Sequence, residues 1–259
     1  FYMSVVASYA LDHDGIYGLS QGRIFSVRII MSSTNTKTGI KILGSSGMLL
    51  VSELYESIQG ESSYCGQRCV FIRLTGCPLR CKWCDSEFSF QGGTRMDIDQ
   101  LVHDVTSMNI PLVEVTGGEP LAQTRCLVLL KKLCDSGLTV LLETSGALDI
   151  KHVDPRVTTI MDIKCPGSGE SGSNLWDNIQ HLKPQDELKL VIACREDYIW
   201  ARDVLNRHGL QGQHTVYLSP AGGILDPAEL ADWILQDRLN VRFQIQVHKV
   251  IWPGRDVGI

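Results

Sequence analysis

The feature that most constrains the fold is a regular alternation of short apolar runs with stretches of helical spacing. Apolar residues recur at helical spacing, for example at Leu127, Leu130 and Leu133, between the runs. This alternation is typical of a parallel α/β sheet with helices outside it. The six runs span residues 70–74, 112–116, 139–143, 158–163, 188–192 and 215–218, and a seventh run at 241–247 predicts a last strand.

Composition narrows the class of protein. The chain has 259 residues, of which 44% are hydrophobic and 20% charged, as in an ordinary globular protein. The longest apolar runs, such as 48–51 and 127–130, are too short to span a membrane. A net charge of −5 argues against a nucleic-acid partner held by bulk electrostatics. We therefore expect small molecules and proteins as ligands, and neither membrane nor nucleic acid.

The cysteine count and the first segment bear on compartment and domain limits. Nine cysteines are odd in number and too few for a disulfide scaffold, which indicates free thiols and a reducing, cytoplasmic compartment. Residues 1–47 lack sustained periodicity and the layout of a signal peptide. We expect residues 1–47 to be a poorly ordered or non-native extension and residues 48–259 to form the working domain.

Unusual sequence follows the predicted strands repeatedly. It falls at 76–86, 117–120, 144–146, 164–169 and 219–223, each directly after an apolar run. In parallel α/β folds ligands bind at the carboxyl ends of the strands. Five such loops therefore predict one shared site.

A cysteine triplet in the first of these loops carries the strongest chemical signal. Cys77, Cys81 and Cys84 have C-x3-C-x2-C spacing, so three thiolates can surround one centre. Structural zinc sites need four ligands, usually from two well-separated C-x2-C-like pairs, and no second C-x2-C pair accompanies the triplet. A [4Fe–4S] cluster bound by three cysteines leaves one iron open for a substrate. We favour such a cluster; structural zinc with a distant fourth ligand and a chance grouping of cysteines remain the alternatives.

Two motifs together resemble the radical S-adenosylmethionine superfamily. The first is the run GCPLRCKWCD at residues 76–85, and the second is GGEP at 117–120, after the next predicted strand. In that superfamily the open iron chelates S-adenosylmethionine, and the Gly-Gly-Glu-Pro loop meets its amino group. Glycines allow the backbone to approach a ligand closely, and Glu119 can accept a hydrogen bond from an ammonium.

Further motifs resemble one branch, the 7-carboxy-7-deazaguanine synthase family, over roughly residues 49–253. They are SIQGE at 57–61, ETSG at 143–146, DIKCPGS at 162–168, LSPA at 218–221 and VHKVIWP at 247–253. The resemblance implies an incomplete TIM-like barrel of about six parallel strands and a homodimer. It also implies a carbon–nitrogen lyase of queuosine and 7-deazapurine biosynthesis. The family converts 6-carboxy-5,6,7,8-tetrahydropterin to 7-carboxy-7-deazaguanine and ammonia, assisted by Mg²⁺.

The resemblance also implies roles, position by position. Cys77, Cys81 and Cys84 would ligate the cluster. The residues expected to border S-adenosylmethionine are Trp83, Asp85, Gly118, Glu119, Asp162, Ile163, Lys164, Ser219, Pro220 and Ala221. Those expected to border the pterin are Ile58, Gln59, Gly60, Glu61, Arg73, Thr116 and His248. Ser86 stands where the family commonly has a magnesium-binding threonine, and it retains the hydroxyl that a hard cation needs.

The implied mechanism is radical chemistry that starts with S-adenosylmethionine on the open iron. A radical takes hydrogen from C6 of the pterin, the ring contracts, ammonia leaves and S-adenosylmethionine is regenerated. A flavodoxin or ferredoxin would suit the cluster as electron donor. Arg73 suits the substrate carboxylate because its guanidinium is fork-shaped, although a local Glu or Asp is an alternative partner.

Two other functions remain open. A glycyl-radical activating enzyme would share the cysteine triplet but has no reason to carry the segments around Gln59–Glu61 and His248. A zinc-stabilised module without catalysis would bind one zinc and no sulfide. Five of the six remaining cysteines, Cys65, Cys69, Cys126, Cys134 and Cys194, are expected to pack as small hydrophobes, whereas Cys165 lies in a predicted site loop. Residues 254–259 receive no role.

Overall fold

The computed structural model describes residues 47–259, so almost all of the expected N-terminal extension lies outside the described residues. The strands are β1 (Met48–Ile58), β2 (Arg68–Leu74), β3 (Thr94–Asp97), β4 (Leu112–Gly117), β5 (Thr139–Thr144), β6 (Thr158–Asp162), β7 (Glu187–Ile192), β8 (Thr215–Pro220) and β9 (Arg242–Phe243). The α-helices are α1 (Ile98–Ser107), α2 (Cys126–Asp135), α3 (Arg195–Arg207), α4 (Pro227–Asp237) and α5 (Val247–Ile251). Short 3₁₀ helices η1 to η5 span Glu87–Phe90, Pro120–Ala122, Pro166–Ser168, Ser171–Ser173 and Trp176–His181.

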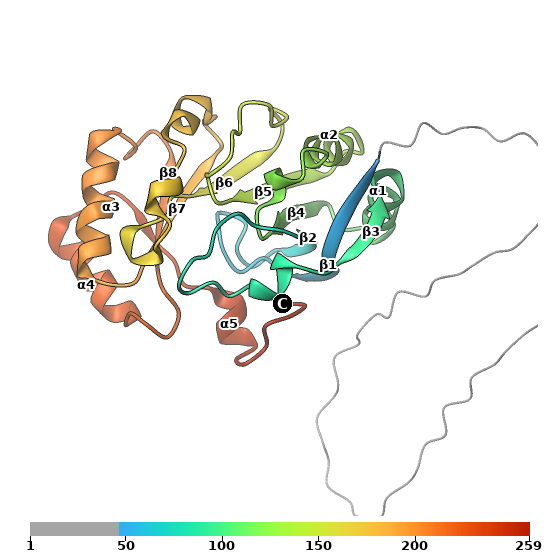
Figure 1. The fold of residues 1–259 in the computed structure, drawn as a ribbon. Helices are drawn as coiled ribbons and strands as arrows, with labels where there is room; N and C mark the ends of the chain where they lie inside the picture. Colours follow the sequence, from blue (N-terminus) through green and yellow to red (C-terminus); the bar gives the residue numbers. More distant parts are fainter. Residues whose placement is uncertain (1–46) are drawn as a thin grey trace, which may run out of the picture. The chain divides into compact units, whose positions relative to one another are not determined.

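The described strands form one sheet of nine, in the order β3-β1-β2-β4-β5-β6-β7-β8-β9. The six predicted strands are confirmed as β2 and β4 to β8, and all pair in parallel. Because β3 and β9 end the order without pairing with each other, the sheet is open. The predicted incomplete barrel is therefore confirmed, with α1 to α4 outside the curved sheet (Figure 1).

The antiparallel strands β1 and β3 were not predicted from the sequence. β1 pairs with β2 and with β3, and its register with β2 shifts between Val51 and Glu53. This irregularity moves the core-facing side chains from the odd positions Leu49 and Val51 to the even position Leu54. The two-residue alternation that marks a strand is thus interrupted within β1.

The two faces of the sheet have different chemistry. In β4, Val113 and Val115 join the large core between sheet and helices, whereas Glu114 and Thr116 alternate to the inner face. Toward the amino-terminal ends of the strands the inner face carries a small apolar cluster, here called the apolar plug. The plug consists of Cys69, Phe71, Leu112, Leu141 and Ile160. Above it the inner face is polar.

The prediction of a last strand over 241–247 is wrong for most of its length. Only Arg242–Phe243 pairs with β8, and Val247 begins α5. The reason is that the glutamines of this segment bond to another loop. The Gln244 side chain accepts from Ser62 N at 2.8 Å and donates to Ser62 O at 3.1 Å.

All nine cysteines are free. Cys69, Cys126 and Cys134 are buried, as expected of small hydrophobes, and Cys194 is half-buried. Cys65 is exposed, so the expectation of burial is wrong there because it lies at a turn of the loop after β1. Within residues 47–259, every helix is too short or too polar to cross a bilayer.

Candidate active site

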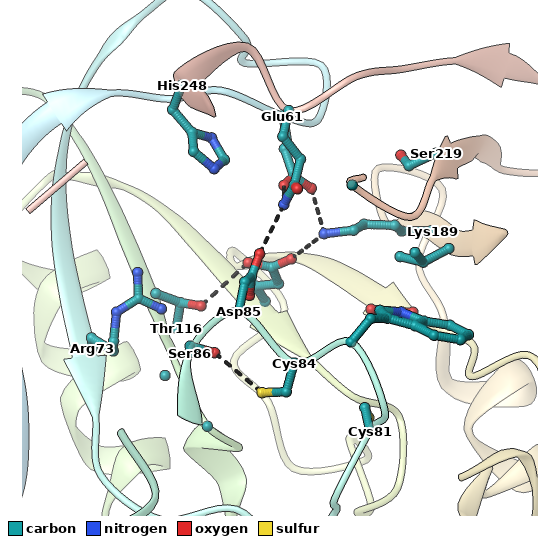
Figure 2. Close-up of a pocket in the computed structure, with 18 of the residues that line it drawn as sticks. Glu61, Arg73, Cys81, Cys84, Asp85, Ser86, Thr116, Lys189, Ser219 and His248 are labelled. Atoms are coloured by element: carbon teal, nitrogen blue, oxygen red, sulfur yellow. Dashed lines mark hydrogen bonds and ion pairs between the residues drawn. The ribbon is translucent and has the colours of Figure 1, made fainter. Parts of the chain in front are cut away.

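One cavity of about 490 Å³ occupies the inner face of the partial barrel, a size typical of small-molecule sites. Most predicted site residues line it: Ile58, Gln59, Glu61, Arg73, Cys77, Cys81, Trp83, Cys84, Asp85, Ser86, Thr116, Gly118, Asp162, Lys164, Ser219, Pro220, Ala221 and His248. Gly60, Glu119 and Ile163 are absent from its lining. In the view of Figure 2, Cys81 and Cys84 lie at one end and Glu61 and His248 at the other.

The two ends come from opposite ends of the sheet. The cysteine loop follows the carboxyl end of β2, as predicted. The segment from Gln59 joins β1 to the start of β2, so it lies at the amino-terminal ends of the parallel strands. Its Ser63 N donates to the carboxylate of Glu187, the first residue of β7. The cavity therefore runs through the barrel interior rather than resting on one rim.

The cysteine loop is held by its own contacts. Arg80 Nη1 donates to the carbonyls of Cys77 at 2.8 Å and Leu79 at 2.6 Å, and its guanidinium lies 4.2 Å from the Phe90 ring centroid. Cys84 N donates to Cys81 O at 3.2 Å. These contacts shape the loop without using any thiol.

The three thiols suit a cluster better than a single ion. Cys77, Cys81 and Cys84 are half-buried and line the cavity. Over residues 47–259 no three His, Cys, Asp or Glu side chains are arranged to hold one metal ion, as structural zinc requires. Thiols that bind different irons of a [4Fe–4S] cluster stand farther apart than the ligands of one ion. Burial raises the pKa of Cys77 and of Cys81, so a bound cluster must supply the charge that keeps them ionised.

The Gly117–Gly118 turn brings β4 against the cysteine loop. A side-chain Cβ on Gly118 would lie 2.5 Å from Gly76 O and 2.7 Å from Cys77 Cβ. Gly117 has a φ of +153°, and a Cβ there would lie 2.2 Å from Leu74 O. Only glycine permits this approach.

Glu119 forms its hydrogen bonds with other groups of the protein. Its carboxylate is fully buried and accepts hydrogen bonds from Leu121 N at 2.9 Å, Thr144 Oγ1 at 2.9 Å and Ser145 N at 2.7 Å. It thereby joins the loops after β4 and β5. Its expected contact with an ammonium group of a ligand stays a prediction.

Buried polar atoms without a protein partner face the cavity on the β6 and β8 side. Asp162 Oδ1 and Ser219 Oγ are two such atoms, and both residues line the cavity. The other oxygen of Asp162 accepts from Lys164 Nζ at 2.7 Å. Despite burial, Asp162 raises the pKa of Lys164, so the ammonium stays charged. A polar ligand at this side would satisfy both orphaned oxygens.

Arg73 already has a carboxylate partner, which confirms the local alternative. Its Nε donates to Glu53 Oε2 at 2.7 Å and its Nη2 to the Tyr55 hydroxyl at 3.1 Å. Burial opposes its charge, but Tyr55 and Glu53 hold the pKa of Arg73 above its ordinary value. The cation is thus fixed at the cavity wall.

Lys189 and Glu143, which the predicted set lacks, form a charge network with the predicted residue Glu61 across the cavity. Lys189 of β7 is buried and forms ion pairs with Glu61 and, at 2.8 Å, with Glu143 (Figure 2). Thr116 Oγ1 donates to the second oxygen of Glu143 at 3.2 Å. Although burial opposes both charges, the pairing raises the pKa of Lys189 and lowers that of Glu143. One sequence signal existed, namely a lysine inside the otherwise apolar run 188–192.

Helix α5 covers the Gln59 end. Val247 N donates to Gly60 O at 3.1 Å, and a Cβ on Gly60 would lie 2.2 Å from His248 Nδ1. Burial lowers the pKa of His248, although Glu61 opposes the shift, so the imidazole is neutral near pH 7.

Two further hydrogen bonds hold residues 249–259 at the site. Lys249 Nζ donates to Asp85 at 2.6 Å, which connects α5 to the cysteine loop. Three residues for which no role was predicted also line the cavity: Arg255, Asp256 and Ile259. Ile259 O accepts from the Tyr55 hydroxyl at 2.9 Å.

Comparison with known proteins agrees with this geometry. The family model "Radical SAM superfamily" matches residues 71–156. A 7-carboxy-7-deazaguanine synthase from Koribacter versatilis is 45% identical over 224 residues, covering 81% of this chain and 99% of the relative. Another from Chlorobaculum tepidum is 44% identical over 214 residues, covering 82% and 97%.

A solved structure shares the fold. The crystal structure of QueE from Escherichia coli superimposes with a TM-score of 0.66 at 21% identity, covering 78% of this chain and 95% of that one. At this identity the likeness concerns the fold alone. The two relatives at 45% and 44% identity, which the chain covers almost completely, show the family: the chain belongs to the 7-carboxy-7-deazaguanine synthase family of radical SAM proteins.

Proposed function

We propose that this chain converts 6-carboxy-5,6,7,8-tetrahydropterin to 7-carboxy-7-deazaguanine with release of ammonia, as a carbon–nitrogen lyase. One observation carries the proposal: a single cavity joins the three-cysteine loop to Gln59, Glu61, Arg73 and His248. The names of the relatives support it. A cavity of about 490 Å³ between two chemically distinct ends suits a cofactor next to a bicyclic substrate.

At one end, Cys77, Cys81 and Cys84 would hold a [4Fe–4S] cluster with one open iron. The bound cluster and S-adenosylmethionine supply the radical chemistry. Asp162 and Ser219, whose buried oxygens lack protein partners, would hydrogen-bond S-adenosylmethionine. Trp83, Asp85, Gly118, Lys164, Pro220 and Ala221 would complete its border, while Ile163 and Glu119 would act from behind the lining.

At the other end, the protein would orient the pterin. Arg73 would offer its guanidinium to the substrate carboxylate in competition with Glu53. Gln59, Glu61, Thr116 and His248 would present polar groups to the ring, with Ile58 and Gly60 beside them. Enclosure by α5 would exclude water from the reacting atoms.

We further propose a hard-cation site at Ser86, whose hydroxyl lies 3.9 Å from Cys84 Sγ. Mg²⁺ there would hold the substrate carboxylate and stabilise negative charge. We also propose a homodimer, a flavodoxin or ferredoxin as reductant, and a reducing compartment such as the cytoplasm. The nine free cysteines support the last point.

Iron, sulfide and product analysis test the function against its alternatives. After anaerobic reconstitution, we expect iron and sulfide in cluster stoichiometry and a deazaguanine product from the carboxylated pterin. One zinc without sulfide would instead identify a zinc-stabilised module. Cleavage of S-adenosylmethionine without deazaguanine would favour a glycyl-radical activating enzyme.

A further inference from the structure

Glu114, in the middle of β4, is a cavity residue to which the proposed site gives no role. It is only 3% exposed and lies on the inner face of the sheet. Gln59 Nε2 donates a short hydrogen bond to its Oε2, and Gln59 Oε1 in turn accepts from Glu61 N at 2.9 Å. Glu114 thus sits directly beneath the segment that we assign to substrate binding, with Oε1 left for the cavity.

The floor around Glu114 is apolar. In the parallel register its neighbours are Phe71 on β2 and Leu141 on β5. Both belong to the apolar plug. A carboxylate in such surroundings is poorly solvated, which favours its neutral form.

The nearby cations are engaged elsewhere. The charged or titratable groups that face Glu114 are Tyr55 on β1, Cys69 and Arg73 on β2, Glu61 in the loop, Glu143 on β5 and Lys189 on β7. Arg73 forms its ion pair with Glu53. In the part of the chain that the structure describes, Lys189 pairs with Glu61 and Glu143 but not with Glu114.

Three carboxyl groups therefore share one ammonium: Glu114 is buried, and Glu61 and Glu143 are half-buried. If all three were ionised, the cluster of Glu61, Glu114, Glu143 and Lys189 would carry a net charge of −2. Protonation reduces this charge at the lowest cost in free energy on Glu114, because Glu114 is the carboxyl group that forms no ion pair with Lys189. Burial, followed by the charges of Glu143 and Glu61, raises the pKa of Glu114 well above its ordinary value.

We propose that Glu114 works as a neutral carboxylic acid that donates a hydrogen bond from the cavity floor to an acceptor atom of the bound pterin ring. The identity of the ligand rests on the proposed function. In this arrangement Oε2 accepts from Gln59 and the protonated Oε1 faces the ring. A buried donor of this kind discriminates against ring systems that place a donor at the same position, because two donors would then be left unpaired.

Infrared difference spectroscopy of the reconstituted protein tests the proposal directly. We expect a carbonyl-stretch band of a protonated carboxyl near pH 7 that is missing in Glu114→Gln and that shifts when the carboxylated pterin binds. Glu187→Gln is the matched control, because Glu187 is also a buried strand carboxyl but lies outside the cavity lining. This control should keep the shifting band.

Kinetics separate donation from a purely structural role. Glutamine keeps the shape, an acceptor for Gln59 and a neutral donor, so Glu114→Gln should raise KM by only about threefold. Glu114→Leu should raise KM about tenfold, the cost of one hydrogen bond. Two results would overturn the proposal: no Glu114 band in ligand-free protein, or a Glu114 band that does not shift when the carboxylated pterin binds. If the protein does not turn over the pterin but ligand-free protein shows the Glu114 band, the proposed function is wrong, whereas the protonated state of Glu114 is supported.

Discussion

Gly118 offers a sharp test of how β4 supports the cysteine loop. A Cβ at this position would lie 2.5 Å from Gly76 O, 2.7 Å from Cys77 Cβ and 2.9 Å from Gly76 C, all closer than the 3.0 Å below which real Cβ atoms essentially never approach. Two of the three atoms are backbone, so no flexible side chain can move aside. In Gly118→Ala one loop must therefore shift by about half an ångström, and such overpacking costs about 1–3 kcal/mol.

The expected outcome has two parts. Urea unfolding of the apo protein under reducing conditions should show a loss of about 1–3 kcal/mol in the free energy of unfolding. Iron and sulfide content after anaerobic reconstitution should fall, because the displaced loop carries Cys77. Gly172→Ala is the matched control, since a Cβ there meets nothing within 4 Å. Equal stability and equal iron content in the two variants would refute the reasoning.

Substitutions at three further positions test the charge network, the magnesium site and the packing of one loop. Lys189→Met should cost about 3–5 kcal/mol near neutral pH, because it strands the carboxylates of Glu61 and Glu143. The loss should shrink as the pH falls below about 4.5, because the pairing with Lys189 lowers the pKa of Glu143 and its contribution disappears once that carboxyl group is protonated; an equal loss at neutral and acidic pH in urea unfolding would contradict it. Ser86→Ala should weaken the dependence of activity on Mg²⁺ while cluster absorbance persists, and Ser86→Thr should restore it; identical magnesium titrations would remove Ser86 from the site. Asn178→Ala should cost about 2 kcal/mol or more in thermal unfolding, because the Asn178 side chain bonds the backbone of Ile150, Gly146 and Leu148; an unchanged melting temperature would contradict it.

The six central strands could be predicted because both of their faces are buried. Parallel strands such as β4 and β7 then appear as compact apolar runs, which helices must separate. β1 escaped detection because its irregular register near Val51 breaks the alternation of faces. Residues 241–247 were misassigned because their glutamines bond to the loop after β1, a tertiary contact that local pattern does not encode.

The site residues likewise divide into those that a local motif marks and those that only tertiary contacts bring together. The cysteine triplet and the glycine turn each lie within one short stretch of sequence and could be recognised directly. Lys189 and Glu114 could have been suspected as lone charged residues in apolar strands, but their partners lie on other strands. The approach of Ile259 to Tyr55 spans 204 residues, so no local signal marked it.

An anaerobic product assay tests the central claim most directly. Reconstituted protein is given the carboxylated pterin, S-adenosylmethionine, Mg²⁺ and a one-electron reductant, and the products are quantified. The account predicts 7-carboxy-7-deazaguanine and ammonia in equal amounts, with S-adenosylmethionine not consumed. Cleavage of S-adenosylmethionine with neither product formed would contradict it.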